Sequence, residues 1–214
     1  MNPMTIRTLQ VGPIATNCYI LCDPAVHRAA VIDPGFEAQR VLAALRDTGC
    51  TADYVILTHG HADHMTEAGR VLRPTGAKLA VFEGELPLLR DPQANLFHSF
   101  SDGPFVPLEP QVLLPDGGTL QVGGLTVRAL HTPGHTAGSC VLLCGDKMFA
   151  GDTLFYESAG RTDMPTGSGT DLARSLRRLA ALPGDYKVLP GHGPATTLGH
   201  ERQFNPFMAE DYPA

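Results

Sequence analysis

The sequence lacks the features that would place the protein in a membrane or on nucleic acid. No apolar run reaches the roughly 18–20 residues that a transmembrane helix needs, and residues 1–7 lack the basic and apolar regions of a signal peptide. The net charge of −6 argues against nucleic acid or an anionic membrane as the main partner. We therefore expect a cytoplasmic protein that acts on a small molecule and binds no nucleic acid and no membrane. Its oligomeric state stays open.

The five cysteines include no Cys-x-x-Cys pair, the spacing typical of zinc ribbons and of redox centres. An odd number of cysteines without such a pair favours reduced thiols in the cytosol. Cys18 and Cys22, like Cys140 and Cys144, are spaced to share one face of a strand. A thiolate metal site is open to them, but small buried strand residues are the favoured interpretation.

The composition is that of an ordinary globular enzyme. The chain has 214 residues, of which 43% are hydrophobic and 18% charged. This length is enough to bury a core without disulfides or a structural metal. We expect residues 1–214 to form a single domain built from two similar halves.

Apolar periodicity predicts an α/β protein, beginning with a meander of three strands and continuing as β-α-β-α. That order favours helices packed outside a sheet. The expected strands are 5–11, 17–22, 29–33, 53–57, 78–82, 111–114, 119–122, 125–131, 139–144, 147–150 and 187–190. The expected helices are 36–48, a helix ending near Pro74, 83–90, 170–181 and 197–210, with a glycine-rich loop at 158–169.

Residues 91–110 differ from the rest of the chain. They contain four prolines and show little periodicity, but they also carry Phe97, Phe100 and Phe105. A loop this long is usually functional or disordered, and three aromatic side chains argue against disorder. We interpret the segment as a linker between the two halves that walls a substrate pocket. The alternative is that its rings only cover a sheet edge.

A dense group of possible metal ligands follows the strand expected at 53–57. His59, His61, Asp63 and His64 lie within six positions, before a helical pattern at 65–72. Imidazole and carboxylate groups suit zinc and its first-row neighbours. A tight loop at a strand end lets these side chains point in several directions. The alternative is a polar, solvated loop, and the metal interpretation is strongly favoured.

Three later residues, His135, Asp152 and His192, share this context, because each follows an apolar strand in a turn rich in Gly or Pro. Taken singly, either histidine is more easily read as a surface or capping residue. Loops at one end of a sheet converge on a common region. Taken together with the group at 59–64, these three residues are therefore interpreted as metal ligands. Asp33, at the end of the strand 29–33, is either a turn former or a carboxylate that holds a ligating histidine by its other ring nitrogen.

These motifs resemble the metallo-β-lactamase superfamily. The match is His-x-His-x-Asp-His at 59–64, Thr-Pro-Gly-His-Thr at 132–136, Ala-Gly-Asp-Thr at 150–153 and Pro-Gly-His-Gly at 190–193. Within it the chain looks most like short, single-domain type II glyoxalases, which are hydroxyacylglutathione hydrolases. Residues 151–155, 160–163 and 205–207 carry that narrower likeness. The resemblance implies an αββα sandwich of two mixed sheets with helices outside and metals at one sheet edge.

The resemblance also implies two divalent metal ions, with zinc favoured and iron or manganese as alternatives. The first ion would be bound by His59, His61 and His135, and the second by Asp63, His64 and His192. Asp152 would bridge both ions. The implied activity is hydrolysis of thioesters such as S-lactoylglutathione by a hydroxide held between the ions. Asp63 is the catalytic candidate, because it can also orient that hydroxide.

The chain departs from the two-domain glyoxalases, whose C-terminal helical domain helps to bind glutathione. Only residues 193–214 follow His192, so we expect no such domain here. Glu157 stands where relatives tend to have a small residue, so it is a candidate for reshaping the pocket. Arg161 is a candidate for binding an anionic substrate group, with a structural ion pair to Asp163 as the alternative.

Two other activities remain open. Persulfide dioxygenases share this fold and motif and use one iron, which His59, His135 and Asp152 would hold here. A hydrolase for lactones or other esters is the second alternative. Metal stoichiometry and dioxygen uptake separate the dioxygenase from the hydrolases.

Overall fold

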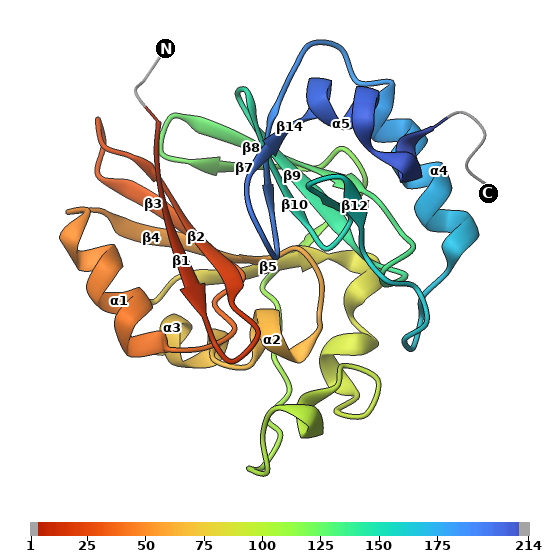
Figure 1. Ribbon diagram of the computed structural model, residues 1–214. Coiled ribbons are helices and arrows are strands. Elements are labelled where there is room, and N and C mark those ends of the chain that lie inside the picture. The colour runs from red at the N-terminus through yellow and green to blue at the C-terminus, as the bar shows by residue number, and fades with distance from the viewer. Residues whose placement is uncertain (1–3, 210–214) are drawn as a thin grey trace.

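Two mixed β-sheets pack face to face, with helices on their outer sides, in the computed structural model, which describes residues 4–209 (Figure 1). The first sheet has the order β1-β2-β3-β4-β5-β6, antiparallel from β1 to β3 and parallel from β3 to β6. Its strands are β1 (Thr5–Val11), β2 (Thr16–Asp23), β3 (Arg28–Ile32), β4 (Thr51–Leu57), β5 (Lys78–Phe82) and β6 (Val112–Leu114).

The second sheet has the order β14-β13-β10-β9-β8-β7, and only β10 and β13 are parallel among its paired strands. Its strands are β7 (Thr119–Val122), β8 (Leu125–His131), β9 (Cys140–Cys144), β10 (Lys147–Gly151), β13 (Lys187–Pro190) and β14 (Thr196–Thr197). A short hairpin of β11 (Leu154–Phe155) and β12 (Ser158–Ala159) stands apart. The expected αββα sandwich is confirmed.

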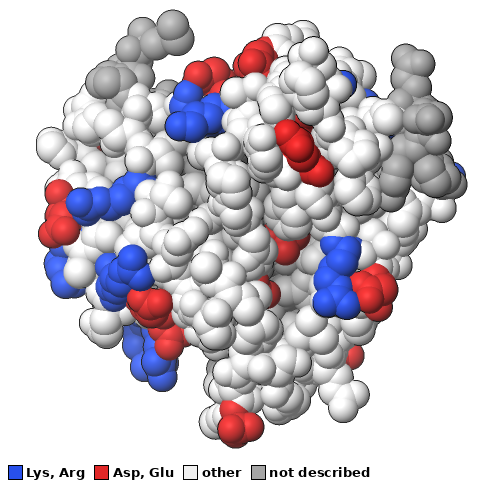
Figure 2. Space-filling view, viewed as in Figure 1, with Lys and Arg blue, Asp and Glu red and all other residues white. Residues whose placement is uncertain are grey.

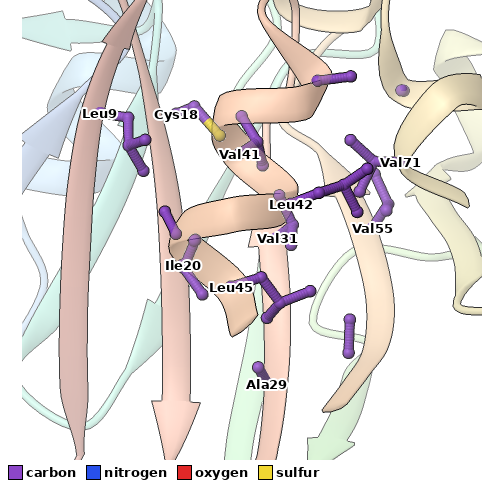
Figure 3. Packing of buried hydrophobic residues seen from close by; sticks show 14 of the residues in the cluster. Leu9, Cys18, Ile20, Ala29, Val31, Val41, Leu42, Leu45, Val55 and Val71 are labelled. Carbon is purple, nitrogen blue, oxygen red and sulfur yellow. The ribbon is translucent and has the colours of Figure 1, made fainter. Parts of the chain in front are cut away.

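Strand β2 explains why the layers hold together, because all eight of its residues are buried. Alternate side chains of a strand point to opposite faces. Tyr19 and Leu21 join the core between the two sheets. Cys18 and Ile20 instead lie under α1 (Ala38–Asp47), whose Val41 belongs to the same cluster (Figure 3).

Helices cover both outer faces. α1 and α3 (Ala68–Thr75) pack on the first sheet, and α4 (Gly169–Ala180) and α5 (Leu198–Phe204) on the second. Among residues 4–209, none of the helices combines the length and apolar character that crossing a bilayer requires. All five cysteines are buried and free. Cys18 and Cys22 lie in β2, and Cys140 and Cys144 lie in β9, where they pack in the core as expected for small strand residues.

The sequence-based prediction of a helix at 83–90 is wrong. The segment forms two 3₁₀ turns, η1 (Glu83–Glu85) and η2 (Leu88–Arg90). Pro87 lies between them and has no N–H to donate to a continuous helix. The final helix is also shorter than 197–210. α5 ends at Phe204, because the residue before Pro206 is disfavoured in helical conformation, and η4 (Pro206–Met208) follows. Residue 210 lies outside the described residues.

The segment 91–110 does not link the two sheets. Strand β6 pairs with β5 in the first sheet, so 91–110 connects two strands of one sheet and the chain crosses to the second sheet only after Leu114. The segment contains a 3₁₀ turn, η3 (Phe97–Ser99). The hairpin β11–β12 and the two-residue β14 were not predicted, since such short strands show no periodicity.

Candidate metal centre

The loop after β4 and the short helix α2 (Ala62–Met65) place four buried polar side chains together. His59 and His61 come from the loop, whereas Asp63 and His64 lie in the first turn of α2. His61 precedes that helix in an extended conformation. The sequence-based expectation that all four residues lie in a loop is therefore wrong for Asp63 and His64, because the helix begins at residue 62.

Three turns of the second sheet bring the remaining candidates to the same place. His135 follows β8, Asp152 follows β10 and His192 follows β13. His135 Nε2 lies 2.9 Å from His61 Nδ1, and His192 Nε2 lies 3.1 Å from Asp63 Oδ2. All seven ligand candidates from the sequence thus meet at one edge of the sandwich.

The seven side chains form overlapping groups, in each of which the ligand atoms lie within 4.8 Å of one another. These groups are His59, His61 and His135; Asp63, His64 and His192; and His59, His64 and Asp152. Asp152 faces the other two groups, since its Oδ1 lies 3.4 Å from His64 Nε2 and its Oδ2 lies 3.6 Å from His135 Nε2. It therefore occupies the position between two ligand sets.

Buried polar atoms without partners indicate that these residues fit a cation. His59 Nε2, His61 Nε2, His64 Nε2 and Asp152 Oδ1 are buried and form no hydrogen bond with any of residues 4–209, although His64 Nε2 and Asp152 Oδ1 lie 3.4 Å apart. Leaving such a group unsatisfied costs about 1–3 kcal/mol, so several of them in one place need an explanation. Imidazole nitrogens and carboxylate oxygens around one point are the donor set of zinc, iron or manganese.

Charges in the centre also favour a bound cation. Burial, and after it the neighbouring His135, lower the pKa of His61 to about 3, which leaves the neutral imidazole that metals bind. At His64 burial acts in the same direction, but Asp63 and Asp152 outweigh it and raise the pKa. The two carboxylates thus create a position where positive charge is stabilised.

Three of the histidines hold their other ring nitrogen in a fixed contact. His64 Nδ1 lies 3.0 Å from Asp33 Oδ2, and His135 Nδ1 lies 2.8 Å from the carbonyl oxygen of Arg161. His192 Nδ1 lies 3.3 Å from the carbonyl oxygen of Ile14. Such contacts select the ring tautomer and orientation that ligation requires.

Asp33 lies in a turn and its carboxylate contacts His64. Its backbone has φ of 53°, a left-handed turn conformation that Asp tolerates better than most residues. Its carboxylate accepts hydrogen bonds from Thr58 N at 2.8 Å and from Thr58 Oγ1 at 2.6 Å, in addition to the contact with His64. It therefore joins the end of β3 to the start of the histidine loop.

Glycine is required where the turns of the second sheet approach the centre. A Cβ atom on Gly191 would lie 2.1 Å from Asp152 Oδ1 and 2.7 Å from His64 Cε1. Both distances are far below van der Waals contact. The glycine before His192 therefore lets the β13 turn close over the two ligand sets.

A cavity of about 450 Å³ opens onto the centre. Its floor contains His61, Asp63, His135, Asp152 and His192. Its walls are mostly apolar and comprise Ile14, Leu96, Phe100, Phe155, Ser158, Ala159, Arg161 and Met164. Residues 91–110 thus contribute Leu96 and Phe100 to the wall. Phe97 is buried instead, and its ring centroid lies 5.1 Å from that of Phe105, so part of the segment packs on itself.

Arg161 lies at the rim of this cavity, and its guanidinium forms two hydrogen bonds of 2.7 Å with Asp163. The ion pair considered from the sequence is present, and binding of an anionic substrate group stays a prediction. Figure 2 shows a face with few charged side chains around its central depression and one adjacent basic and acidic pair beside it. Glu157 is exposed, contacts His200 at 3.0 Å and does not line the cavity.

Sequence reasoning missed the residues that support the centre from other segments. Thr16 Oγ1 donates to Asp63 Oδ2 at 3.0 Å, and Tyr19 donates from its hydroxyl to the carbonyl oxygen of Pro190 at 2.6 Å. Glu85 is buried beside the histidine loop. Thr16 was detectable as a polar residue starting an apolar strand. Glu85 was detectable because it follows β5 at the sheet edge where β4 also ends.

The model of the metallo-beta-lactamase superfamily matches residues 11–192. The chain belongs to the metallo-β-lactamase superfamily. Among members of this superfamily, the hydroxyacylglutathione hydrolase GloC of Haemophilus influenzae is 32% identical over 96% of this chain and 98% of its own. The crystal structure of the B3 metallo-β-lactamase BLEG-1 is 33% identical, with a TM-score of 0.88 over 95% of this chain and 99% of that one. The crystal structure of TTHA1623 in a di-iron-bound form is 33% identical, with a TM-score of 0.78 over 94% of this chain and 99% of that one.

Proposed function

We propose that the protein is a dinuclear metal-dependent hydrolase of thioesters such as S-lactoylglutathione. The observation that carries this proposal is the pair of ligand sets on either side of Asp152, with their unsatisfied buried atoms, at the floor of a 450 Å³ cavity. A purely structural zinc site is a closed four-ligand cage, whereas this one has ligands for two ions and opens to the cavity. The similarity to GloC supports the substrate class, and that to TTHA1623 supports two metals.

In this proposal His59, His61 and His135 hold one ion, Asp63, His64 and His192 hold the other, and Asp152 contacts both. Zinc suits these ligands best, and iron and manganese are also compatible with them. Two such ions would supply a water of lowered pKa, near about 7, and polarise the substrate carbonyl.

Asp63 is the residue of this chain that we assign to orienting the attacking water. Burial alone would raise its pKa, but His64 and His192 outweigh burial and keep the carboxylate ionised. Thr16 donates a hydrogen bond to its Oδ2, which restricts the carboxylate, and Asp63 lines the cavity. An ionised carboxylate fixed in this way can accept a hydrogen bond from water and aim its lone pair at a carbonyl carbon.

The remaining walls would hold the substrate and limit access of bulk water. Ile14, Phe100 and Phe155 offer apolar surface to the acyl group or to the thiol carrier. The thiolate that leaves is stable on its own, so no strong general acid is required. Arg161 retains guanidinium donors beyond those used by Asp163, which makes it the residue to test for a carboxylate of the thiol carrier.

The test assays the zinc-loaded protein on S-lactoylglutathione and the iron-loaded protein on glutathione persulfide, with dioxygen consumption followed in the second assay. We expect metal-dependent hydrolysis of the thioester and no dioxygen uptake. One iron per chain with dioxygen consumed would instead indicate a dioxygenase. Turnover of lactones without turnover of any thioester would contradict the substrate class but not the metal centre.

A further inference from the structure

Glu85 is a buried carboxylate that lies between the loop carrying His61 and the loop carrying His135. It is 2% exposed. Its Oε1 accepts a hydrogen bond from the backbone N–H of Gly60 at 2.7 Å, and its Oε2 accepts one from Thr136 Oγ1 at 3.0 Å. The backbone N–H of Gly138 also donates to it. One side chain thus binds both loops, 25 and 51 residues away in sequence.

The two loops leave a space shaped for this carboxylate. A Cβ atom on Gly138 would lie 2.3 Å from Glu85 Oε2 and 2.4 Å from its backbone nitrogen. A Cβ atom on Gly60 would lie 3.3 Å from Glu85 Oε1, tighter than most such contacts. The contact with Glu85 therefore requires glycine at position 138, because a larger residue would overlap the carboxylate.

Stability alone does not explain an acidic residue at this position. No cation pairs with Glu85 among residues 4–209. Burial raises the pKa of its carboxyl to about 7, although the hydrogen bonds from Gly60, Thr136 and Gly138 act against that rise. A buried carboxylate without a cation is costly, and an apolar side chain of similar volume often stabilises a core as well or better.

The two loops have few other connections. The backbone N–H of Cys140 donates to the carbonyl oxygen of Thr58 at 2.9 Å. Together with the bond from Glu85 to Gly60, this contact fixes the backbone on both sides of His59. Thr136, which Glu85 holds on the other loop, directly follows His135. His61 Nδ1 and His135 Nε2, one from each loop, lie 2.9 Å apart. Glu85 thus holds the backbone next to both of these histidines.

We propose that Glu85 is a positioning residue that joins the two histidine loops and sets the separation of His61 and His135 for metal binding. This role rests on the metal centre proposed above, but its structural part, the joining of the loops, can be measured without metal.

The test compares Glu85→Gln with Glu83→Gln, an exposed residue on the same 3₁₀ turn. The amide cannot accept hydrogen bonds on both of its terminal atoms. We expect Glu85→Gln to weaken zinc affinity about 10- to 100-fold in competition with a chelator, as changes behind a metal ligand typically do. In the metal-free protein, amide hydrogen exchange should rise roughly tenfold in both the 58–62 and the 136–139 segments. Glu83→Gln should change neither.

A second pair of variants covers the case in which Glu85→Gln does not fold. Thr136→Ser keeps the hydroxyl that donates to Glu85 and should retain the zinc affinity of the natural chain. Thr136→Val removes that donor and should weaken zinc binding and speed exchange at Gly60, although the substitution lies on the other loop.

The outcomes separate this proposal from the proposed function. If the natural chain binds no zinc, the metal centre fails, and exchange in the two segments then decides whether Glu85 joins the loops. Unchanged exchange in Glu85→Gln and Thr136→Val overturns the role. Faster exchange with zinc affinity equal to that of the natural chain also overturns it, because Glu85 would then support the backbone without positioning the ligands.

Discussion

Asp152 is the residue that faces both ligand sets, because its carboxylate lies 3.4–3.6 Å from His64, His135 and His192. A monodentate ligand serves one ion, whereas a carboxylate between two sets can serve both. Removing it should therefore have a larger effect than removing any single histidine.

Asp152→Ala should lose both metal ions and nearly all hydrolysis, as seen by metal analysis after gel filtration and by the thioester assay. The matched control is Asp146→Ala, an exposed aspartate in the turn between β9 and β10 whose side chain contacts Lys147. Two ions and normal turnover in Asp152→Ala would show that the bridging role is wrong.

Asp33→Asn tests the support behind His64. The side-chain oxygen of asparagine can still accept the hydrogen bond from Thr58 N. Its NH₂ group would replace the carboxylate oxygen that Thr58 Oγ1 and His64 Nδ1 contact, and this group cannot accept a hydrogen bond. We expect metal affinity to fall about 10- to 100-fold, mainly at the ion held by His64. Chelator competition measures this, with the exposed Asp47→Asn as control. Equal affinities for the two variants would refute the role.

The residues that could be predicted from the sequence are those whose chemistry is concentrated in a motif. The ligand candidates at 59–64 were visible for that reason, and His135, Asp152 and His192 were visible by their common place after apolar strands. Glu85 and Thr16 stand outside any such motif, since each acts through hydrogen bonds to segments distant in sequence. A lone buried acid carries no local pattern.

At the scale of elements, the hairpin β11–β12 is a wall of the cavity that is held by the C-terminal segment. Asn205 donates from Nδ2 to the carbonyl oxygen of Ser158 at 2.9 Å and to Glu201 Oε2 at 2.8 Å. Glu201 is fully buried and also accepts from the backbone N–H of Glu157 at 2.9 Å. The position of Phe155 over the cavity therefore depends on residues 201–205.

Asn205→Ala should loosen this hairpin and lower the free energy of unfolding by about 1–3 kcal/mol, the cost of leaving buried groups without partners. We expect KM for the thioester to rise several-fold with a smaller change in kcat, because the metal ligands are untouched. Steady-state kinetics and chemical denaturation measure both effects. Gln203→Ala, exposed on α5, is the control, and an unchanged KM in Asn205→Ala would contradict the role of the hairpin.

Elements with strong apolar runs were predicted to within a few residues, as β4 and β8 illustrate. The errors have local causes. Pro87 divides 83–90 into two 3₁₀ turns, and Pro206 ends α5 early. The assignment of β6 to the first sheet was not accessible, because pairing between β5 and β6 depends on the path of the long segment between them.

At the scale of the whole molecule, the centre joins the two sheets. Its candidate ligands come from the loop after β4 and from α2 on one side, and from the turns after β8, β10 and β13 on the other. A metal that binds all of these side chains stabilises only the folded state, since the unfolded chain does not hold the side chains together. The folding of the sandwich and the binding of metal should therefore be linked.

Removing metal with a chelator should lower the melting temperature, and adding zinc back should restore it. At a free metal concentration about 100 times Kd the stabilisation is about 2.7 kcal/mol, which corresponds to roughly 5–10 °C for a chain of this size. Differential scanning calorimetry measures the shift. Asp152→Ala should not respond to zinc, whereas Asp146→Ala should respond normally. A melting temperature that is insensitive to metal in the natural chain would argue against the linkage.

The number of metal ions per chain tests the central claim most directly. After loading with zinc and removal of the excess, elemental analysis should find two ions per chain in the natural protein. His192→Ala should retain the ion of His59, His61 and His135 and lose most of the other. A single zinc ion per chain, or metal content in His192→Ala equal to that of the natural protein, would contradict the dinuclear centre.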